Sequence, residues 1–111
     1  MKKYQLERDI QRDIMHYLKL KRCIAVKVGS GAFIVENRFV RMGAKGTADI
    51  LAVCPIREDG TFRGLPLAIE VKRPGQKPTD PQQQFLDDWN AAGGVGIVAR
   101  SIDDVEAVLG L

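Results

Sequence analysis

The chain has 111 residues, 45% hydrophobic and 28% charged, which predicts one compact domain with a small stability reserve, for which a homodimer is a natural arrangement. Its two cysteines exclude a disulfide scaffold or a cysteine-based zinc site, and the absence of a long apolar stretch or signal-peptide segment predicts a cytoplasmic protein without membrane association. The net charge of +3 and the pI near 9.0 are compatible with a polyanionic partner.

The first half of the chain predicts one helix followed by short strands. Apolar residues recur at helical spacing among charged ones over residues 3–20, which predicts an amphipathic helix. Glu36-Asn37 is the expected turn of a hairpin, and the glycine-rich segment 43–47 is an expected loop. Strands are predicted around these turns at residues 23–28, 33–35, 38–41 and 49–53.

The second half predicts an alternation of strands and helices. Residues 55–66 are polar and rich in turn residues, which predicts an exposed connection to a strand at residues 67–72. Residues 73–78 contain Pro-Gly and end that strand. Asp80 is the expected N-cap of a second helix, which has proline at its first position and ends at two glycines. A strand and a short helix complete the chain, at residues 95–99 and 101–109.

Acidic residues interrupt two of the apolar strand segments. Asp49 opens one apolar run, and Glu70 and Lys72 close another. Because side chains alternate between the faces of a strand, Glu70 and Lys72 project together, and Asp49 meets Glu70 if the two strands pair. Charges in such segments are costly to bury unless another group compensates them.

Charge counting favours a divalent cation as the compensating group. Glu7 borders the apolar face of the first helix, where it could point into the same cleft as Asp49 and Glu70. Two like charges about 4 Å apart repel by roughly 4 kcal/mol at an effective dielectric constant of about 20. The three carboxylates less Lys72 leave two negative charges, which suits Mg²⁺ or Mn²⁺. Such a cation activates water and polarises a phosphoryl oxygen, so the residues predict hydrolysis of a phosphodiester by in-line attack.

The same residues have structural alternatives. Glu70 and Lys72 could form a salt bridge on a solvated face, and Asp49 could be a turn residue. Under these alternatives the chain is a non-catalytic DNA-binding module, or an assembly protein whose acidic residues form structural ion pairs.

The order of these residues resembles a known signature. Gly46-x-x-Asp49 followed by Glu70-x-Lys72 is similar to the signature of the PD-(D/E)XK nuclease superfamily. The proline of that signature is replaced by Ala48, at a position that varies within the superfamily.

The chain more closely resembles the VRR-NUC branch of that superfamily. An early helix in that branch carries a glutamate, as Glu7 does here, and a Lys-Gly-x-x-Asp segment precedes the E-x-K strand, as residues 45–49 do. A later helix opens with glutamine and closes with glycine, as residues 82–94 do. The resemblance spans nearly the whole chain with the motifs in order.

This resemblance implies a fold, a cofactor and an activity. It implies an α/β, restriction-endonuclease-like αβββαβ core, in which a mixed central sheet is flanked by helices. It also implies Mg²⁺ or Mn²⁺ bound by Glu7, Asp49, Glu70 and the Val71 carbonyl, no organic cofactor, and Lys72 as the catalytic lysine. The implied activity is that of a homodimeric, structure-selective DNA endonuclease similar to Holliday junction resolvases, which leaves 5′-phosphate and 3′-hydroxyl ends; a flap-specific or single-strand-specific nuclease is the alternative.

Two glutamines are further candidates for this site. Gln82 occupies the first place on the apolar face of the second helix, where it could contact the attacking water, Lys72 or a phosphate, or point to solvent. The resemblance favours a catalytic role for Gln82, with Gln83 and Gln84 as capping and surface residues. Gln11 lies one turn after Glu7 and either lines the same cleft or belongs to the helix surface.

Basic residues cluster near the proposed site and are candidates for contacts with the DNA backbone. They predict recognition of DNA shape, because no recognition helix or zinc finger is evident. Lys45 and Arg73 are the strongest candidates, and the full set is Lys27, Arg38, Arg41, Lys45, Arg73 and Lys77.

Overall fold

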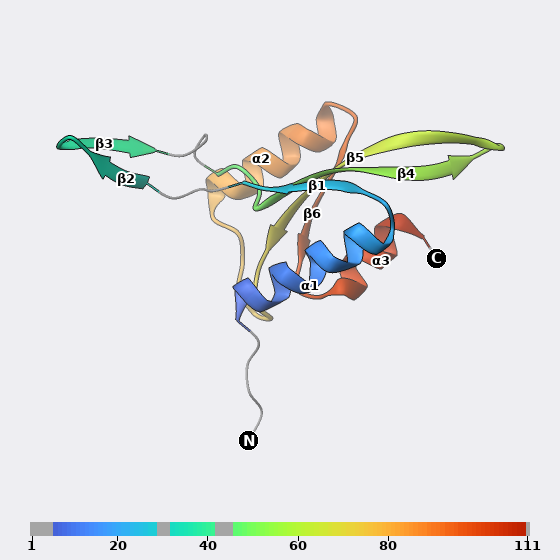
Figure 1. Ribbon diagram of the computed structural model, residues 1–111, viewed down its shortest axis with the longest axis horizontal. Coiled ribbons are helices and arrows are strands. Elements are labelled where there is room, and N and C mark those ends of the chain that lie inside the picture. The colour runs from blue at the N-terminus through green and yellow to red at the C-terminus, as the bar shows by residue number, and fades with distance from the viewer. Residues whose placement is uncertain (1–5, 29–31, 42–45, 111) are drawn as a thin grey trace, which may run out of the picture.

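The computed structural model describes residues 6–28, 32–41 and 46–110, and it describes the strand residues 32–35 and 38–41 by their backbone alone. The chain forms a four-stranded sheet with helices on both faces and a separate two-stranded hairpin (Figure 1). The elements in chain order are α1 (Glu7–Leu20), β1 (Ile24–Lys27), β2 (Ala32–Val35), β3 (Arg38–Arg41), β4 (Ile50–Glu58), β5 (Thr61–Val71), α2 (Asp80–Ala91), β6 (Val95–Ala99) and α3 (Ile102–Leu109).

The sheet has the mixed topology that the sequence predicts. Its strand order is β1-β4-β5-β6, with antiparallel pairing from β1 to β4 and from β4 to β5, and parallel pairing of β5 with β6. The elements α1, β1, β4, β5, α2 and β6 therefore form the predicted αβββαβ core. The β2–β3 hairpin is inserted between the first two strands of this core, and α3 follows its last strand.

Helices cover the two faces of the sheet unequally. α1 and α3 lie together on one face (Figure 1), where Ile14 and Val105 belong to the main buried cluster with residues of β4 and β5. On the other face, Leu86 of α2 packs with Ala48 and Ala68 in a smaller cluster. α2 contacts β5 and β6, so the β1 side of this face has no helix of the described residues over it.

α1 buries the apolar stripe that its sequence pattern predicts. Ile10, Ile14 and Leu18 are fully buried, and charged residues occupy the opposite side of the helix. The helix begins at Glu7 with Leu6 as its N-cap; residues 3–5 of the predicted helix lie outside the described residues. No helix among the described residues is long and apolar enough to cross a membrane.

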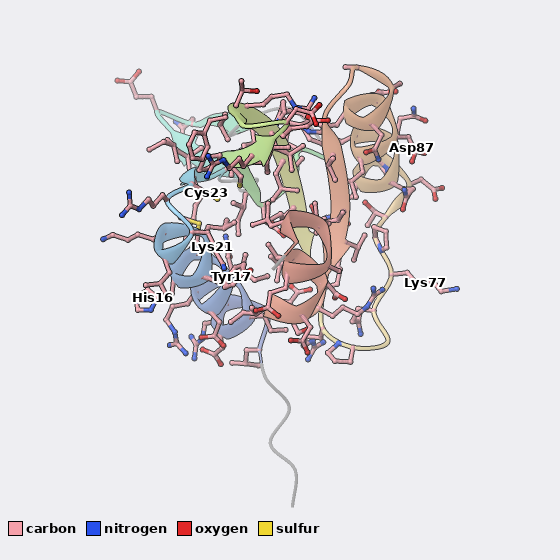
Figure 2. All side chains as sticks on the ribbon, turned by 90° about the vertical axis from the view of Figure 1, so that its right-hand side faces the viewer. His16, Tyr17, Lys21, Cys23, Lys77 and Asp87 are labelled. Atoms are coloured by element: carbon pink, nitrogen blue, oxygen red, sulfur yellow. The ribbon has the colours of Figure 1, made fainter. Side chains whose placement is uncertain are left out.

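The two cysteines lie in this core as reduced thiols, as predicted. Cys23 and Cys54 are both buried in the main cluster, and each directly adjoins a residue of the Ile24–Val53 pair of β1 and β4. Burial is the main cause that raises the pKa of the Cys54 thiol. Tyr17 of α1 packs beside Cys23 (Figure 2).

The prediction of an exposed connection over residues 55–66 is wrong in one respect. These residues are largely exposed, but they extend β4 and β5 into one long hairpin whose turn is Asp59-Gly60. Proline is tolerated here because Pro55 lies beyond the last residue of β4 that pairs with β1, and Pro66 precedes the first residue of β5 that pairs with β6. The polar composition of this β-ribbon resembles that of a loop, because no helix among the described residues packs against the ribbon.

The start of α2 also differs from its prediction by one residue. The N-cap is Thr79, not Asp80, because the Thr79 hydroxyl accepts the Gln82 N–H (3.4 Å) while the Gln82 side chain accepts the Thr79 N–H (2.8 Å). This reciprocal capping box outweighs the single carboxylate of Asp80 as a helix start. The predicted end of α2 before Gly93 and the predicted limits of β6 are both confirmed.

Candidate active site

A glycine loop brings Asp49 to the end of the sheet beside the N-terminus of α2. Gly46 has φ +84°, and a β-carbon at this position would overlap the backbone carbonyl of Pro81. Only glycine allows both this backbone conformation and this close approach. Ala48 is then buried against α2, and Asp49 follows directly before β4.

Asp49 is fixed between two strands. Its Oδ2 accepts a hydrogen bond from the Val71 N–H (2.8 Å), and its backbone carbonyl accepts one from the Val28 N–H (2.8 Å). The carboxylate therefore lies where β5 ends, next to Glu70. The prediction that the two strands pair and that Asp49 meets Glu70 is confirmed.

Glu70 is a buried carboxyl group whose polar contacts are incomplete. Its exposed fraction is 2%, and its Oε2 is buried without a hydrogen-bond partner among the described residues. The pKa of Glu70 is raised to about 8. Burial is the main cause, the nearby Asp49 carboxylate adds to the rise, and the charge of Lys72 opposes it. The Glu70 carboxyl group therefore holds its proton at neutral pH.

Lys72 projects with Glu70, as the alternation of side chains predicts. Lys72 Nζ lies 3.9 Å from Glu70 Oε1, and both side chains are largely shielded from solvent. The backbone of Lys72 continues the sheet for one residue, because its N–H donates to the Ala99 carbonyl (3.1 Å). This contact is no solvated surface ion pair, so the structural alternative for this part of the motif does not hold.

Arg100 is a residue of this region that the sequence analysis missed. Its guanidinium donates to the Gln76 carbonyl (2.6 Å), across the turn that Gln76 N–H closes on the Arg73 carbonyl (3.0 Å). The Asp104 carboxylate accepts a hydrogen bond from the backbone N–H of Arg100 (2.8 Å), and this bond fixes the backbone at Arg100. No local pattern indicates Arg100, since the contact joins residues that are 24 positions apart.

Glu7 stands apart from the other two acidic residues. Its side chain is exposed, although its charge still contributes to the raised pKa of Glu70. Among the described residues, no three acidic, histidine or cysteine side chains form a group that could hold a metal ion. Of the three carboxylates predicted to gather in one pocket, the structure brings together Asp49 and Glu70.

The glutamines of α2 have well-defined local partners. Gln82 is half-buried and its side-chain oxygen is engaged in the capping box, so any contact with a substrate would come from its amide nitrogen. Gln83 and Gln84 donate to Asp87 and Asp88 on the helix surface. The capping role predicted for Gln83 thus belongs to Gln82. On α1, Gln11 is half-exposed one turn after Glu7.

The predicted basic residues occupy different positions around this site. Arg73 and Lys77 are exposed in the connection after β5, and Lys77 points away from the body of the molecule (Figure 2). Lys27 is exposed at the end of β1 and pairs with Ile50, so its side chain lies on the α1 face, opposite to that of Asp49. Lys45 and the side chains of Arg38 and Arg41 lie outside the described residues.

Comparison with solved structures identifies the class of fold. One solved structure, named "VRR_NUC domain", superposes with a TM-score of 0.64 over 92% of this chain and 91% of its own length, at 20% sequence identity. A second, named "VRR_NUC domain protein", has a TM-score of 0.56 over 96% of this chain and 86% of its own length, at 24% identity. No family model and no curated protein sequence matches the chain.

The chain therefore has the fold of the VRR-NUC domains, and the predicted resemblance is confirmed at the level of the fold. The similarity covers almost the whole chain.

Proposed function

We propose that the chain is a metal-dependent, structure-selective DNA endonuclease that hydrolyses phosphodiester bonds, with Mg²⁺ or Mn²⁺ as its cofactor. The observation that carries this proposal is Glu70: a carboxyl group with 2% exposure, one oxygen without a hydrogen-bond partner among the described residues, Asp49 beside it and Lys72 at 3.9 Å. A fully buried carboxylate left half-satisfied costs free energy, and such groups concentrate at functional sites.

The donors at this site fit a hard divalent cation. A buried, protonated Glu70 beside Asp49 gains by exchanging its proton for a cation, and Glu70 Oε2 accepts no hydrogen bond from the described residues. Asp49, Glu70 and the Val71 carbonyl would hold the ion, and Glu7 would complete the set from the rim. When bound, the ion would activate water and neutralise charge that develops on the phosphoryl group.

The remaining site residues have roles that follow from their chemistry. Lys72 is shielded from solvent beside Glu70, so as a compact point charge it can orient the attacking water or stabilise the developing negative charge. The proton that leaves the attacking water passes to bulk solvent through Lys72 or the residues beside it. The products carry 5′-phosphate and 3′-hydroxyl ends. The Gln82 amide nitrogen contacts the water or a phosphate, and Gln11 lines the approach from α1.

The proposed substrate is branched DNA such as a Holliday junction, bound in the cytoplasm through its phosphates. Arg73 and Lys77, which are exposed in the connection after β5, would contact the strand that is cut, and the exposed Lys27 would contact a neighbouring strand. Arg38, Arg41 and Lys45 complete this basic set. A junction is resolved by two cuts in opposed strands and each chain carries one site, so the active species is a homodimer with two-fold symmetry.

Cleavage assays on defined DNA structures test this proposal. We expect Mg²⁺-dependent or Mn²⁺-dependent nicking of a four-way junction at a higher rate than of flap, single-stranded or linear duplex DNA. Preference for the flap or the single strand would favour the alternative nuclease specificity. Junction binding without cleavage under any of these conditions would instead favour a non-catalytic DNA-binding module.

A matched pair of lysine variants separates this activity from a contaminant. Lys72→Ala should lower the single-turnover rate by about 10³-fold or more, because a charge that acts in the transition state is lost. Lys19→Ala removes an exposed lysine from the far end of α1 and should leave the rate unchanged. Equal activity of the two variants would contradict the proposed role of Lys72.

A further inference from the structure

The β4–β5 hairpin forms an arm that carries an exposed aromatic residue. β4 and β5 extend beyond β1 and β6 as a two-stranded ribbon (Figure 1), and Phe62 lies next to the turn of this arm, paired with Arg57. The exposed fraction of Phe62 is 74%, and the residue belongs to neither buried cluster. A two-stranded ribbon has no second layer that could cover such a ring. Most of the ring is therefore available to another molecule.

The Phe62 ring borders a hollow of about 260 Å³ on the face of the sheet that carries α2. The lining of this hollow is mainly apolar and includes Ile24 and Val53, which pair with each other across β1 and β4. Arg22 and Arg63 also line it, and no acidic residue does so in the described part of the chain. Pockets for drug-sized ligands begin at about 300 Å³, so a slightly smaller hollow suits a single ring system.

Arg22 is held beside this hollow in an unfavourable backbone conformation. It follows Lys21, the C-cap of α1, and the helix ends in a Schellman motif: the N–H groups of Arg22 and Cys23 donate to the carbonyls of Lys19 (3.0 Å) and Leu18 (2.9 Å). Glycine is usual at this position because the motif requires a positive φ, and Arg22 has φ 63°. Backbone strain of this kind concentrates at functional positions, which indicates that the Arg22 side chain is used.

Two arginines near the ring carry charges that the described residues do not neutralise. The Arg57 guanidinium lies over the Phe62 ring, 5.7 Å from its centre. Neither Arg57 nor Arg22 forms an ion pair with another described residue. Arg63, in contrast, is paired with Glu58 (3.0 Å) on the opposite face of the arm. The surroundings of the Phe62 ring are thus cationic, which favours a ligand that combines a flat apolar group with negative charge.

A nucleotide outside a base pair has both of these chemical properties. Its base presents a flat face that stacks on an aromatic side chain, and its phosphates accept hydrogen bonds from arginine. A base inside an intact duplex is stacked between its neighbours, so its faces are not accessible to a ring on the protein surface. A ring and free arginines at one place therefore favour an unpaired nucleotide over a base pair.

We infer that the β4–β5 arm binds an unpaired nucleotide of DNA, with its base stacked on Phe62 above the hollow and its adjoining phosphates on Arg22 and Arg57. The choice of DNA rests on the proposed function, to which this site adds a second contact away from the candidate active site. The site reads the presence of an accessible base and not its identity, because every base has a face that can stack.

The position of the arm relates this site to the candidate active site. Phe62 and Glu70 lie on the same face of β5, because they are an even number of residues apart and the pairing of β5 with β4 is continuous between them. Their eight-residue separation is about 26 Å at the rise of a β-strand. This is less than one turn of duplex DNA, about 34 Å. A DNA molecule that is cut beside Glu70 therefore reaches Phe62 where its base pairing is interrupted within one turn of the cut.

Binding to two single strands that differ only in their bases tests this inference without cleavage. The first strand is a fluorescent oligothymidylate, and the second has the same length and the same phosphates but abasic nucleotides. In a chelator, fluorescence anisotropy should show that the wild type binds the first strand about tenfold more tightly, the range expected for one stacked base. Phe62→Ala should bind both strands with nearly the same affinity. An equal affinity of the wild type for the two strands would overturn the inference.

Two further substitutions at position 62 separate stacking from apolar contact. Phe62→Leu keeps an apolar side chain without a ring, so it should lose the base preference as Phe62→Ala does. Phe62→Trp should keep or increase the preference, because a larger ring stacks at least as well. Leu20→Ala is the matched control: Leu20 is 82% exposed at the end of α1, and its removal should leave the preference unchanged. A preference that Phe62→Leu retains would contradict stacking on Phe62.

Arg22→Gly tests the phosphate contact in a variant that the fold favours. Glycine relieves the left-handed backbone, so the thermal stability should stay unchanged or rise. The affinity for both strands should nevertheless fall, and the dependence of binding on salt should decrease by the equivalent of about one phosphate contact. Arg12→Ala removes the same charge from the middle of α1, where Arg12 lies 3.7 Å from Asp9, and should leave the salt dependence unchanged. Equal salt dependence of Arg22→Gly and the wild type would contradict the assigned contact.

The outcomes distinguish this inference from the proposed function. A wild type that cleaves a four-way junction but binds both single strands equally, or binds neither, would overturn the inference and leave the nuclease activity standing. A base preference that depends on Phe62, in a chain that cleaves no DNA with Mg²⁺ or Mn²⁺, would support the inference and contradict the proposed catalysis.

Discussion

The two ends of β5 depart from the usual distribution of side chains in opposite ways. At the Val71 end, Glu70 is an acidic residue with almost no exposure, and one of its oxygens has no hydrogen-bond partner within the described part of the chain. At the Thr61 end, Phe62 is a large apolar residue that is 74% exposed. A buried polar group without a hydrogen-bond partner indicates a ligand-binding site, whereas an exposed aromatic residue indicates a surface that packs against another molecule. One strand thus carries two unsatisfied features, and each indicates a different class of partner.

The two glycines near these ends provide the largest expected contrast. Gly46, at the Val71 end, and Gly60, in the hairpin turn, have similar φ values of +84° and +80°, but only Gly46 lies against another segment. Gly46→Ala should lower the free energy of unfolding by at least about 3 kcal/mol, through backbone strain and overlap with Pro81. Gly60→Ala should cost about 1 kcal/mol, from strain alone. Urea denaturation measures both, and equal losses would contradict the described packing of the glycine loop.

The pH dependence of stability sharpens the difference in burial between the ends. The pKa of Glu70 is raised by folding from 4.5 to about 8, so the folded chain binds the proton more tightly than the unfolded chain. This contribution is fully present below pH 4.5 and is lost as the pH rises through 8. In a chelator, the wild type should lose roughly 4 kcal/mol of stability relative to Glu70→Gln between these limits.

Glu58→Gln, at the other end of the same hairpin, is the control for this measurement. Glu58 is exposed in its pair with Arg63, so its removal should change the pH profile little. Parallel profiles of the wild type and Glu70→Gln would show that Glu70 ionises in an ordinary environment.

Thermal unfolding with added cation tests the missing ligand directly. Mg²⁺ or Mn²⁺ at about a hundred times its dissociation constant should stabilise the wild type by about 2.7 kcal/mol. Glu70→Gln should lose most of this gain, because the amide is a poorer ligand than the carboxylate. Phe62→Glu should retain it, because position 62 is remote from the site. Stabilisation that both variants retain in full would place the cation elsewhere.

The smallest effect is expected for the hydrogen bond of Arg100 to the Gln76 carbonyl. Arg100→Ala should lower the free energy of unfolding by about 1 kcal/mol, the range of one charge-assisted hydrogen bond at a partly exposed site. Hydrogen exchange at the Gln76 amide should become faster, since the turn that it closes loses its support. Arg57→Ala, which removes a cation–π contact near the hairpin turn, should leave that amide unaffected.

Most of the fold was predictable because its signals are local. The stripe of Ile10, Ile14 and Leu18 has the period of a helix, and the apolar run of β6 lies between glycine and a helix cap, so each was located within a few residues. The outer part of the β4–β5 hairpin was missed because no helix covers it, and its residues therefore read as a loop. The start of α2 was displaced by one residue because Thr79 and Asp80 are both good caps and only the reciprocal bonds of Gln82 decide between them.

The part of the candidate site that lies on paired strands was predictable from the sequence. Alternation along one strand placed Lys72 beside Glu70, and the pairing of two apolar runs placed Asp49 beside Glu70. Glu7 was harder, because the helical period gives the face on which a residue lies but not its distance from another element. Arg100 has no sequence signal, because its partner is a backbone carbonyl in a distant turn.

The two buried cysteines, Cys23 and Cys54, allow transient opening of the core to be measured by thiol labelling. A thiol reacts with an alkylating reagent only as the thiolate and only when solvent reaches it, and burial disfavours both conditions for Cys54. Because both thiols lie in the cluster beneath α1, labelling under native conditions proceeds through molecules in which α1 has moved away from this face of the sheet. The labelling rate measures how often this face is uncovered, without denaturant, bound cation or DNA.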